Sequence, residues 1–514
     1  MKDKGGSRMK KYSRIIWALM AVILVCCLVL PASIAYAETP LSVSVVVAGQ
    51  ANTGLGSPFQ HHSFVADGVM WVFYQADAAN QVVGSWSEDG TTWVALPAIT
   101  GCNTYNMTAN ETHGGQFDTW YNAADDTVRF IVVNASTNNS PIAYCSYAIN
   151  ATAHTLTPES AWRTAVAGVA NVSYRNPTIC LNNSEQVFIT YGYVLNGSSD
   201  VRVMSTNNST SATWLPDTGF PIYNMSANAS RPSMYGSVIP LYTSGNVSVQ
   251  YAGYNGSVYR IYQTAVYWNG TSWVRGAVYD IDTSGWWLTD DAEWNYNAVS
   301  IDTSINDNDV AIQYSQTNGS KYRTFFNRRA NESDAWGSSG LYARNFGAGG
   351  WALDYVGAMG IRNAIYSLTY SGWDMSGGSY AVYSNDFDAI TGDWSGIAVV
   401  ASDPEVPYVS TMSDYSYDHS GTGYLGYIFG NQNNDIMYGL YGPALPPVIP
   451  TVVSDFVNAT GMIVSLLISF LLIVLLLGIA FKEGMNNGWN EGTKLAITAV
   501  IGIIIIETII IAFF

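Results

Sequence analysis

Residues 87–93 of this chain read Ser-Glu-Asp-Gly-Thr-Thr-Trp, a polar turn that ends in a tryptophan. Comparable segments are Asn207-Asn-Ser-Thr-Ser-Ala-Thr-Trp214 and Trp268-Asn-Gly-Thr-Ser-Trp273. Neighbouring tryptophans of this series lie 52 to 69 residues apart, and the series consists of Trp93, Trp162, Trp214, Trp273, Trp336 and Trp394. A period of this size, with a hairpin and an aromatic residue in each unit, is typical of a β-propeller.

The chain between these tryptophans has the pattern of β-strands. Apolar and polar residues alternate, with Asn, Asp and Gly at the bends, and no stretch has the 3.6-residue period of a helix. We therefore expect an all-β domain. Each unit contains a strongly apolar second strand, predicted at residues 69–74, 127–133, 186–191, 246–252, 309–314 and 363–370.

The number of blades depends on how the two ends of the propeller are counted. Residues 408–441 contain three more strand-like pieces without a closing tryptophan, and residues 41–48 form an orphan strand near the start. Propellers avoid exposed sheet edges when one terminus supplies the missing strand of the blade at the other end. This count gives a seven-bladed β-propeller, and a six-bladed one with extra flanking strands is the alternative.

Apolar segments at both ends of the chain predict secretion and a membrane anchor. Residues 1–37 combine a basic start, an apolar run and Ala35-Tyr36-Ala37, which is typical of a cleaved signal peptide, with an uncleaved anchor as the alternative. The propeller is then expected at residues 38–442, followed by a proline-rich stalk at 443–460.

Two apolar stretches, at residues 461–481 and 495–514, each have the length of a transmembrane helix. Lys482 and Lys494 bound the connector between them, residues 482–494, so the positive-inside rule places it in the cytoplasm and the domain outside. Glu507, within the second span, is either a contact to another helix or subunit, and so a point of homo-oligomer assembly, or a protonated side chain near the outer face.

The composition excludes some partners and favours attached sugar. The formal charge of −17 would repel phosphate backbones, so we expect no nucleic-acid binding. The 18 Asn-X-Ser/Thr sequons indicate an N-glycosylated protein of the cell surface or of a viral envelope. The glycosylation sites that we predict are Asn106, Asn110, Asn134, Asn171, Asn196, Asn224, Asn246, Asn255, Asn269, Asn318 and Asn331.

Cysteines and acidic residues give little sign of a cofactor. The mature domain contains three cysteines, Cys102, Cys145 and Cys180, so at most one disulfide can form within it. No His/Cys cluster has metal-ligand spacing. Residues 290–293 include three acidic side chains that could hold Ca²⁺, although a solvated acidic loop is the favoured interpretation. We expect no cofactor and no other metal.

Ser87, Asp89, Gly90 and Trp93 resemble the Asp-box of sialidase-like β-propellers, a hairpin in which Asp caps the turn and Trp packs between strands. The resemblance covers this one segment, and the other tryptophan segments match it loosely. It implies a sialidase-like propeller fold, in which Asp-boxes are structural and lie away from the active site. The Phe/Tyr-Arg-Ile-Pro motif of sialidases is absent, and Arg175-Asn-Pro177 and Arg231-Pro232 echo it in part.

Function is expected where the innermost strands of the blades begin. Arg175 and Arg231 head two adjacent blades and could clamp a carboxylate, as sialidase arginines do. Asp354 and Tyr355 could act as nucleophile or acid/base in glycoside cleavage. The other ligand-binding candidates are His62, His113, Trp286, Trp287 and Glu293. The alternative is that these polar residues only solvate the mouth of the channel.

These observations lead to three hypotheses about function. The main one is recognition, in which a membrane-anchored propeller binds glycans or glycoproteins for attachment of a cell or a virus particle. The second is a sialidase-like glycoside hydrolase. The third is a structural surface coat, in which lateral packing is the function. The expected partners are a glycan or glycoprotein ligand and, through the two C-terminal helices, membrane lipid.

Overall fold

All secondary-structure elements that the computed structural model describes are β-strands. The chain divides into two compact units, Met1–Ala444 and Leu445–Phe514, and every described residue belongs to the first. The described residues are 42–49, 59–76, 81–97, 99, 116–133, 141–196, 198–206, 214–223, 235–241, 244–254, 257–281, 296–300, 310–317, 322–329, 336, 341–345, 355–362, 365–374, 379–388, 392–395, 398–402, 412–414, 425–431, 433 and 435–441.

The strands form consecutive antiparallel repeats, each named here by its first strand. The β2 repeat contains β2 (His61–Ala66), β3 (Val69–Ala76), β4 (Gln81–Ser87) and β5 (Val94–Ala95). The β6 repeat contains β6 (Phe117–Asn122), β7 (Thr127–Val133), β8 (Ile142–Asn150), β9 (Thr155–Pro158) and β10 (Arg163–Val166). The β11 repeat contains β11 (Val172–Leu181), β12 (Val187–Leu195) and β13 (Ser198–Thr206).

The later repeats follow the same order along the chain. The β14 repeat contains β14 (Gly236–Leu241), β15 (Asn246–Tyr254), β16 (Tyr259–Trp268) and β17 (Trp273–Asp280). The β18 repeat contains β18 (Tyr296–Ser300), β19 (Val310–Thr317), β20 (Tyr322–Arg329) and β21 (Leu341–Asn345). The β22 repeat contains β22 (Tyr355–Arg362), β23 (Ile365–Asp374), β24 (Ser379–Asp388) and β25 (Ala398–Ser402). The strands β3, β7, β12, β15, β19 and β23 confirm the predicted apolar second strands.

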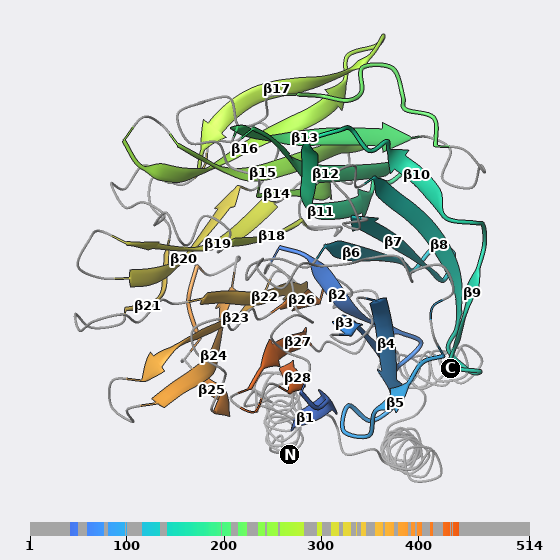
Figure 1. Cartoon of the computed structure of the whole chain (residues 1–514). Coiled ribbons are helices and arrows are strands. Elements are labelled where there is room, and N and C mark those ends of the chain that lie inside the picture. Colours follow the sequence, from blue (N-terminus) through green and yellow to red (C-terminus); the bar gives the residue numbers. More distant parts are fainter. Residues whose placement is uncertain are drawn as a thin grey trace, which may run out of the picture. The chain divides into compact units, whose positions relative to one another are not determined.

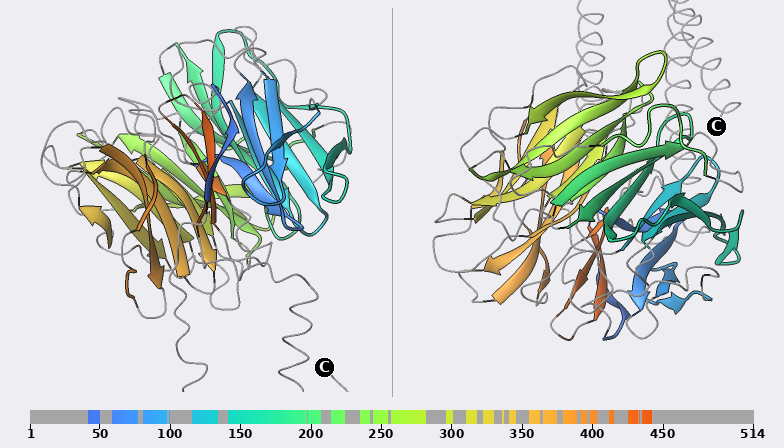
Figure 2. Two further views of the ribbon diagram at one scale, coloured as in Figure 1. Left: turned by 90° about the horizontal axis from the view of Figure 1, so that it is seen from below. Right: turned by 45° about the horizontal axis from the view of Figure 1, so that its top comes forward.

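The last repeat combines the two ends of the domain. It contains β26 (Met412–Asp414), β27 (Leu425–Gly430) and β28 (Ile436–Tyr441), and its fourth strand is β1 (Ser42–Val47). β1 pairs antiparallel with β28, with Ser42 opposite Leu440. Figure 2 shows the dark blue β1 beside the orange-red strands of this repeat. The prediction that residues 41–48 complete the C-terminal unit is therefore confirmed.

The first strands of the repeats contact one another in cyclic order. β2 contacts β6, and the series continues through β11, β14, β18, β22 and β26 back to β2. β26 and β2 pair in parallel, with His61 opposite Ser413. Figure 1 shows the repeats arranged around a common centre, with these first strands toward the middle. This is a propeller-like arrangement, and it confirms the all-β prediction.

The recurring tryptophans pack each repeat against the repeat before it. Trp214 makes an edge contact with Tyr144 on β8, at 5.3 Å between ring centroids. Trp273 contacts Phe188 on β12, at 5.0 Å, and Trp394 contacts Phe326 on β20, at 5.7 Å. Because the series marks contacts between sheets, its period equals one repeat.

The remaining three tryptophans follow the same rule. Trp93 contacts Tyr438 on β28, at 5.0 Å. Trp162 packs against the core between the β2 and β6 repeats, and Trp336 is buried in the core between the β14 and β18 repeats. Three of the six rings are buried and three are partly buried, and their packing contributes to the apolar contact between neighbouring sheets.

Side-chain amides also tie neighbouring repeats together. Asn327 Nδ2 donates a 2.7 Å hydrogen bond to the carbonyl of Ile281, and Gln313 Nε2 donates a 2.9 Å hydrogen bond to the carbonyl of Thr369. Each bond satisfies a backbone carbonyl of the adjacent repeat, as buried polar groups require.

None of the described residues forms a helix of the length and apolarity that a membrane span needs. The predicted signal peptide, the stalk and the stretches 461–481 and 495–514 lie outside the described residues. Cys145 and Cys180 are buried free thiols, and Cys102 also lies outside the described part.

Candidate functional site

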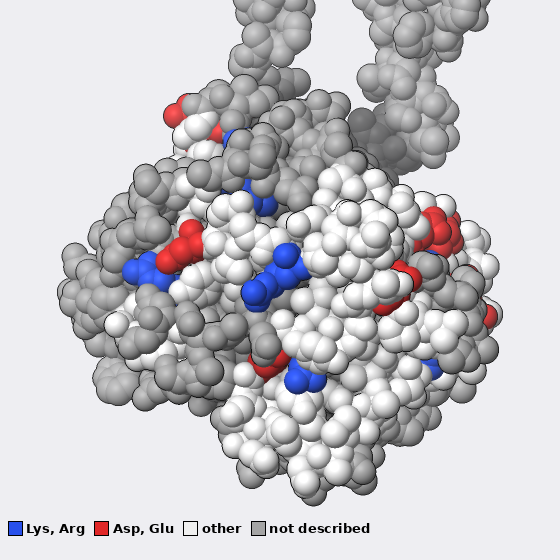
Figure 3. Space-filling view, turned by 90° about the horizontal axis from the view of Figure 1, so that it is seen from above, with Lys and Arg blue, Asp and Glu red and all other residues white. Residues whose placement is uncertain are grey.

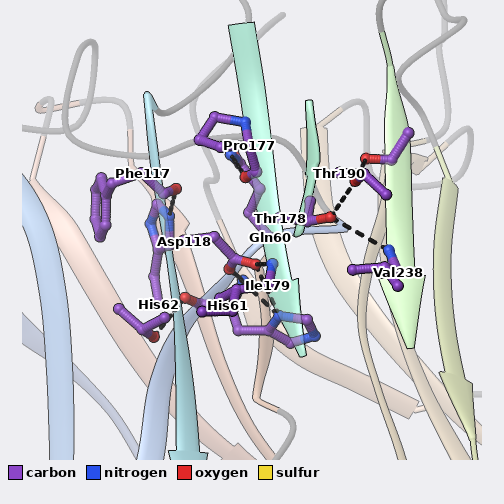
Figure 4. Close-up of polar contacts among 12 residues, drawn as sticks. Gln60, His61, His62, Phe117, Asp118, Pro177, Thr178, Ile179, Thr190 and Val238 are labelled. Atoms are coloured by element: carbon purple, nitrogen blue, oxygen red, sulfur yellow. Dashed lines mark hydrogen bonds and ion pairs between the residues drawn. The ribbon is translucent and has the colours of Figure 1, made fainter. Parts of the chain in front are cut away.

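A buried carboxylate joins three first strands at the centre of the ring. Asp118 on β6 accepts hydrogen bonds from the backbone N–H of His61 on β2 and, at 2.8 Å, from that of Ile179 on β11 (Figure 4). Asp118 has no solvent exposure, and burial raises the pKa of its carboxyl, with the nearby His61 acting in the opposite direction. Since its oxygens already serve backbone donors, this carboxylate acts as a clamp between strands.

His61 and His62, at the start of β2, are buried in the wall that the first strands of the repeats form around the centre of the domain. His61 Nδ1 is 3.3 Å from Asp118 Oδ1, and the ring makes an edge contact with Trp120. His62 stacks on Phe117 at 3.8 Å, and its Nε2 lies 3.0 Å from the carbonyl of that residue. Burial lowers the pKa of His62 to about 3, so the ring is neutral and Nε2 donates the proton. His62, a predicted ligand-binding residue, is thus placed inside the wall and offers no surface to a ligand.

A β-bulge interrupts β11 next to this clamp. The register with β12 shifts between Arg175 and Thr178, and Asn176 has a positive φ of 46°. The carbonyl of Pro177 accepts a 2.9 Å bond from Gln60 Nε2, which reaches across from the β2 repeat. Bulges re-aim side chains at sheet edges and functional sites. Arg175, which is predicted to bind ligand, lies at this bulge and its Nε donates 3.3 Å to Ser173 Oγ.

Most other predicted site residues lie outside the described part of the chain. They are His113, Arg231, Trp286, Trp287, Glu293 and Asp354, and with them the acidic segment 290–293. Tyr355 begins β22, but its side chain is not among those described. No group of three His, Cys, Asp or Glu side chains in the described ranges could hold a metal ion. The arginine clamp and the catalytic pair therefore stay predictions.

The structure assembles a cluster that the sequence analysis did not name, here called the Tyr–Arg cluster: Tyr193, Asp200, Arg202 and Tyr223. The Arg202 guanidinium carbon lies 3.3 Å from the centroid of the Tyr193 ring and 4.7 Å from that of Tyr223. The Nε of Arg202 donates a 3.4 Å hydrogen bond to Asp200 Oδ2. A guanidinium held between two rings and a carboxylate has little freedom left to lose on binding.

Strand register brings these residues together at one end of the β11 repeat. Tyr193 on β12 lies opposite Asp200 on β13 and also opposite Tyr174, near the start of β11. Tyr223 arrives from a later segment, because Ile222 forms a bridge with Val203 on β13. The cluster therefore lies at the end where the first strands begin, which is the end at which function was expected.

The cluster is accessible to solvent. The Tyr223 residue is 51% exposed, and the side chain of Arg202 is 21% exposed. Among the described residues, neither Nη atom of Arg202 has a hydrogen-bond partner. Figure 3 views the side of the domain that carries β13, β16 and β17, where charged side chains are few and scattered. An accessible guanidinium on such a surface could receive an anion.

The Asp-box turn has a structural role. Asp89 Oδ1 accepts bonds from the N–H groups of Thr91 and Thr92, at 2.7 and 2.6 Å, and Gly90 has a φ of +70°. A Cβ at Gly90 would lie 3.1 Å from Leu440 Cδ1 on β28, so this turn sits close to the last repeat. It lies at the end of β4, and hence at the opposite end of the repeats from the Tyr–Arg cluster.

Comparisons with known proteins give structural likeness alone. No protein-family model and no curated protein sequence matches the chain. An ulvan lyase of polysaccharide lyase family PL25, bound to -[GlcA(1-4)Rha3S]-, is similar with a TM-score of 0.49 and 9% identity, over 79% of this chain and 96% of that one.

An arabinanase and an arabinofuranosidase are similar as well. An α-L-arabinanase of Penicillium chrysogenum has a TM-score of 0.42 and 12% identity, over 69% of this chain and 100% of that one. An α-L-arabinofuranosidase of Fusarium graminearum has a TM-score of 0.39 and 13% identity, over 69% and 99%. None of these three is described as a sialidase. These likenesses concern the fold alone.

Proposed function

We propose that this chain is a secreted, membrane-anchored, seven-bladed β-propeller that binds acidic glycans, with the Tyr–Arg cluster as the binding site. The blade count is supported by the cyclic contacts of β2, β6, β11, β14, β18, β22 and β26, and by the strand that β1 adds to β28. The signal peptide and the transmembrane hairpin are supported by the sequence patterns of the two ends. The Asp-box alone carries the sialidase-like resemblance.

The geometry of Arg202 is the observation that carries the binding proposal. Asp200 occupies only the Nε side of the guanidinium. The two Nη groups are therefore available to the paired oxygens of a carboxylate or sulfate, which match the guanidinium fork. The exposed ring of Tyr223 offers an apolar face to the C–H side of a sugar ring. A uronic acid or a sulfated sugar presents both features together.

The first and last described strands of the domain have their outer ends away from the Tyr–Arg cluster. Ser42 at the start of β1 lies opposite Leu440 near the end of β28. Because β28 runs parallel to the first strands, both positions lie at the end of the repeats opposite the Tyr–Arg cluster.

A glycan-cleaving enzyme is the second candidate. Its predicted catalytic residues are Asp354 and Tyr355. A surface coat is the third candidate. Both become outcomes of the binding experiment described next.

The experiment uses the full chain purified in detergent, with immobilised polygalacturonate, dextran sulfate and neutral dextran as probes. We expect retention on the two acidic polymers only, and a loss of about 10-fold or more in affinity for Arg202→Ala and for Arg202→Lys. The lysine variant keeps the charge but loses the planar fork. Arg275→Ala, at an exposed position on β17, removes the same charge and should bind as the wild type does.

Product masses are recorded in the same experiment. Retention without a change in polymer mass supports the binding proposal, and a lower product mass supports the enzyme. Equal affinity of the wild type, the two Arg202 variants and Arg275→Ala would overturn the Tyr–Arg cluster as the site. No retention on any probe would overturn the proposal as a whole and favour the coat.

A further inference from the structure

The side-chain amides of the sequon asparagines differ in exposure and in their hydrogen bonds. Attachment of an N-linked glycan requires an accessible Asn Nδ2, because this atom forms the new bond to the sugar. The described residues include sequon asparagines that are exposed and one that is enclosed between two repeats. This difference allows the sequons to be sorted.

Asn269 presents its amide nitrogen most clearly. Its Oδ1 accepts bonds from the N–H groups of Thr271 and Ser272, at 3.0 and 2.9 Å, in the turn between β16 and β17. The residue is exposed, and Gly270 follows with a φ of +98°. Because the carbonyl side of the amide is held by the turn, Nδ2 remains free to react without loss of a turn bond.

Asn150 has the same arrangement at the end of β8. Its Oδ1 accepts a 2.9 Å bond from the N–H of Ala153, and the residue is exposed. Thr152 completes the sequon. This position is not among the glycosylation sites that the sequence analysis predicts, so the structure adds it.

Asn171 and Asn196 form a pair at one end of the β11 repeat. They flank the last ladder pair of β11 and β12, Val172 opposite Leu195. Both are exposed and have positive φ values, 64° and 51°. Among the described residues, neither side chain donates a hydrogen bond.

Asn182 is buried, and both the nitrogen and the oxygen of its side-chain amide form hydrogen bonds. Its Nδ2 donates 2.7 Å to the carbonyl of Gly245 in the β14 repeat, and its Oδ1 accepts from the N–H groups of Ser184 and Gln186, at 3.0 and 2.9 Å. The residue is 7% exposed. A glycan on Nδ2 would break the tie between the two repeats and would need space that Gly245 occupies.

We propose that the chain carries N-linked glycans on Asn150, Asn171, Asn196 and Asn269, and that Asn182 stays unmodified. In each transfer the Nδ2–C1 bond forms and the bond between C1 and the pyrophosphate oxygen of a lipid-linked oligosaccharide breaks. The lipid pyrophosphate is the leaving group, and Nδ2 loses one proton. The modification needs the secretion that residues 1–37 predict, and it does not require glycan binding by the Tyr–Arg cluster.

The test is expression of the full chain in a eukaryotic secretory host, beside a secreted reference glycoprotein that proves the host competent. The protein is digested and treated with peptide N-glycosidase in heavy-oxygen water, which converts each occupied Asn into labelled Asp. We expect label at Asn150, Asn171, Asn196 and Asn269 and none at Asn182. Thr271→Ala should remove the label from Asn269, whereas Thr271→Ser keeps the sequon and should retain it.

Two results would overturn the proposal. One is label at Asn182 in secreted protein that remains folded. The other is absence of label at the four exposed positions while the reference glycoprotein is modified. Binding of the Arg202 variants to dextran sulfate reports separately on the Tyr–Arg cluster, so failure of one proposal is distinguishable from failure of the other.

Discussion

Trp93 Nε1 donates a 2.8 Å hydrogen bond to Ser44 Oγ, and so joins the Asp-box turn of the β2 repeat to the N-terminal strand of the last repeat. Ser44 Oγ in turn donates 2.7 Å to the carbonyl of Gly90 in the same turn. One hydroxyl therefore holds the strand that closes the ring, in addition to the ladder between β1 and β28.

Ser44→Ala should lower the free energy of unfolding by about 1–3 kcal/mol, because it leaves the indole N–H and the Gly90 carbonyl without their partner. Urea unfolding followed by tryptophan fluorescence measures the change. Ser44→Thr keeps the hydroxyl and serves as the control. Equal stability of the alanine variant and the wild type would show that the ladder alone holds β1.

Asp89→Asn tests the charge of the Asp-box. The backbone N–H groups of Thr92 and Thr91 lower the pKa of Asp89, so the ionised form is favoured in the folded state. The ionised carboxylate contributes fully to the free energy of unfolding above about pH 4, the pKa of Asp in the unfolded state. This contribution is lost as pH falls toward the lower pKa of Asp89 in the folded state. Melting curves should show the wild type more stable than the variant at pH 7, with the difference shrinking below about pH 4. A difference that is independent of pH would contradict this.

Trp273→Ala and Trp268→Ala form a matched pair, because the two residues lie opposite each other on β17 and β16. Trp273 is 9% exposed and packs on Phe188, whereas Trp268 is 47% exposed. Loss of the buried ring should cost about 3–5 kcal/mol in the free energy of unfolding. Loss of the exposed ring should cost under about 1 kcal/mol. Similar costs would contradict the assignment of the tryptophan series to contacts between sheets.

Asp118→Ala should lower the free energy of unfolding by about 3 kcal/mol, since the N–H groups of His61 and Ile179 lose their buried acceptor. Asp118→Asn keeps one carbonyl oxygen and should fall between the alanine variant and the wild type. Chemical unfolding of the three proteins provides the comparison. A cost below about 1 kcal/mol for the alanine variant would mean that water replaces the carboxylate.

Tyr223→Ala should weaken binding to dextran sulfate by about 10-fold, because the sugar and Arg202 both lose a ring face. Tyr223→Phe keeps the ring and should bind as the wild type does. Higher salt should reduce the affinity of each protein, since exposed charges are screened. Retention measured at two salt concentrations would give both effects. An unchanged affinity of Tyr223→Ala would exclude this ring from the site.

Local patterns in the chain were sufficient to predict most of the fold. The alternation in residues 127–133 corresponds to β7, and the turn chemistry of residues 87–93 corresponds to the Asp-box hydrogen bonds. The tryptophan period predicted the repeat because six of the repeats each pack one tryptophan against the neighbouring repeat. The closing strand, residues 41–48, was predictable since an unpaired sheet edge is costly.

The candidate site was predicted less well. Arg175 was expected at the head of a blade, and the structure places it beside a bulge in β11. His62 was expected to face a ligand, but it is buried against Phe117, because its neutral ring packs as an aromatic. A sequence pattern places a residue at a strand end but does not distinguish a side chain in the wall from one on the surface.

The amino-acid sequence by itself determined the all-β class, the repeating unit and the strand that closes the domain, because these depend on alternation, turn residues and the burial of one aromatic residue in each unit. Only the tertiary structure decided which side chains meet. Tyr193, Arg202 and Tyr223 come together because strand register and the bridge of Ile222 to Val203 align three separate segments. Register is set by packing between sheets, and no short stretch of sequence contains that information.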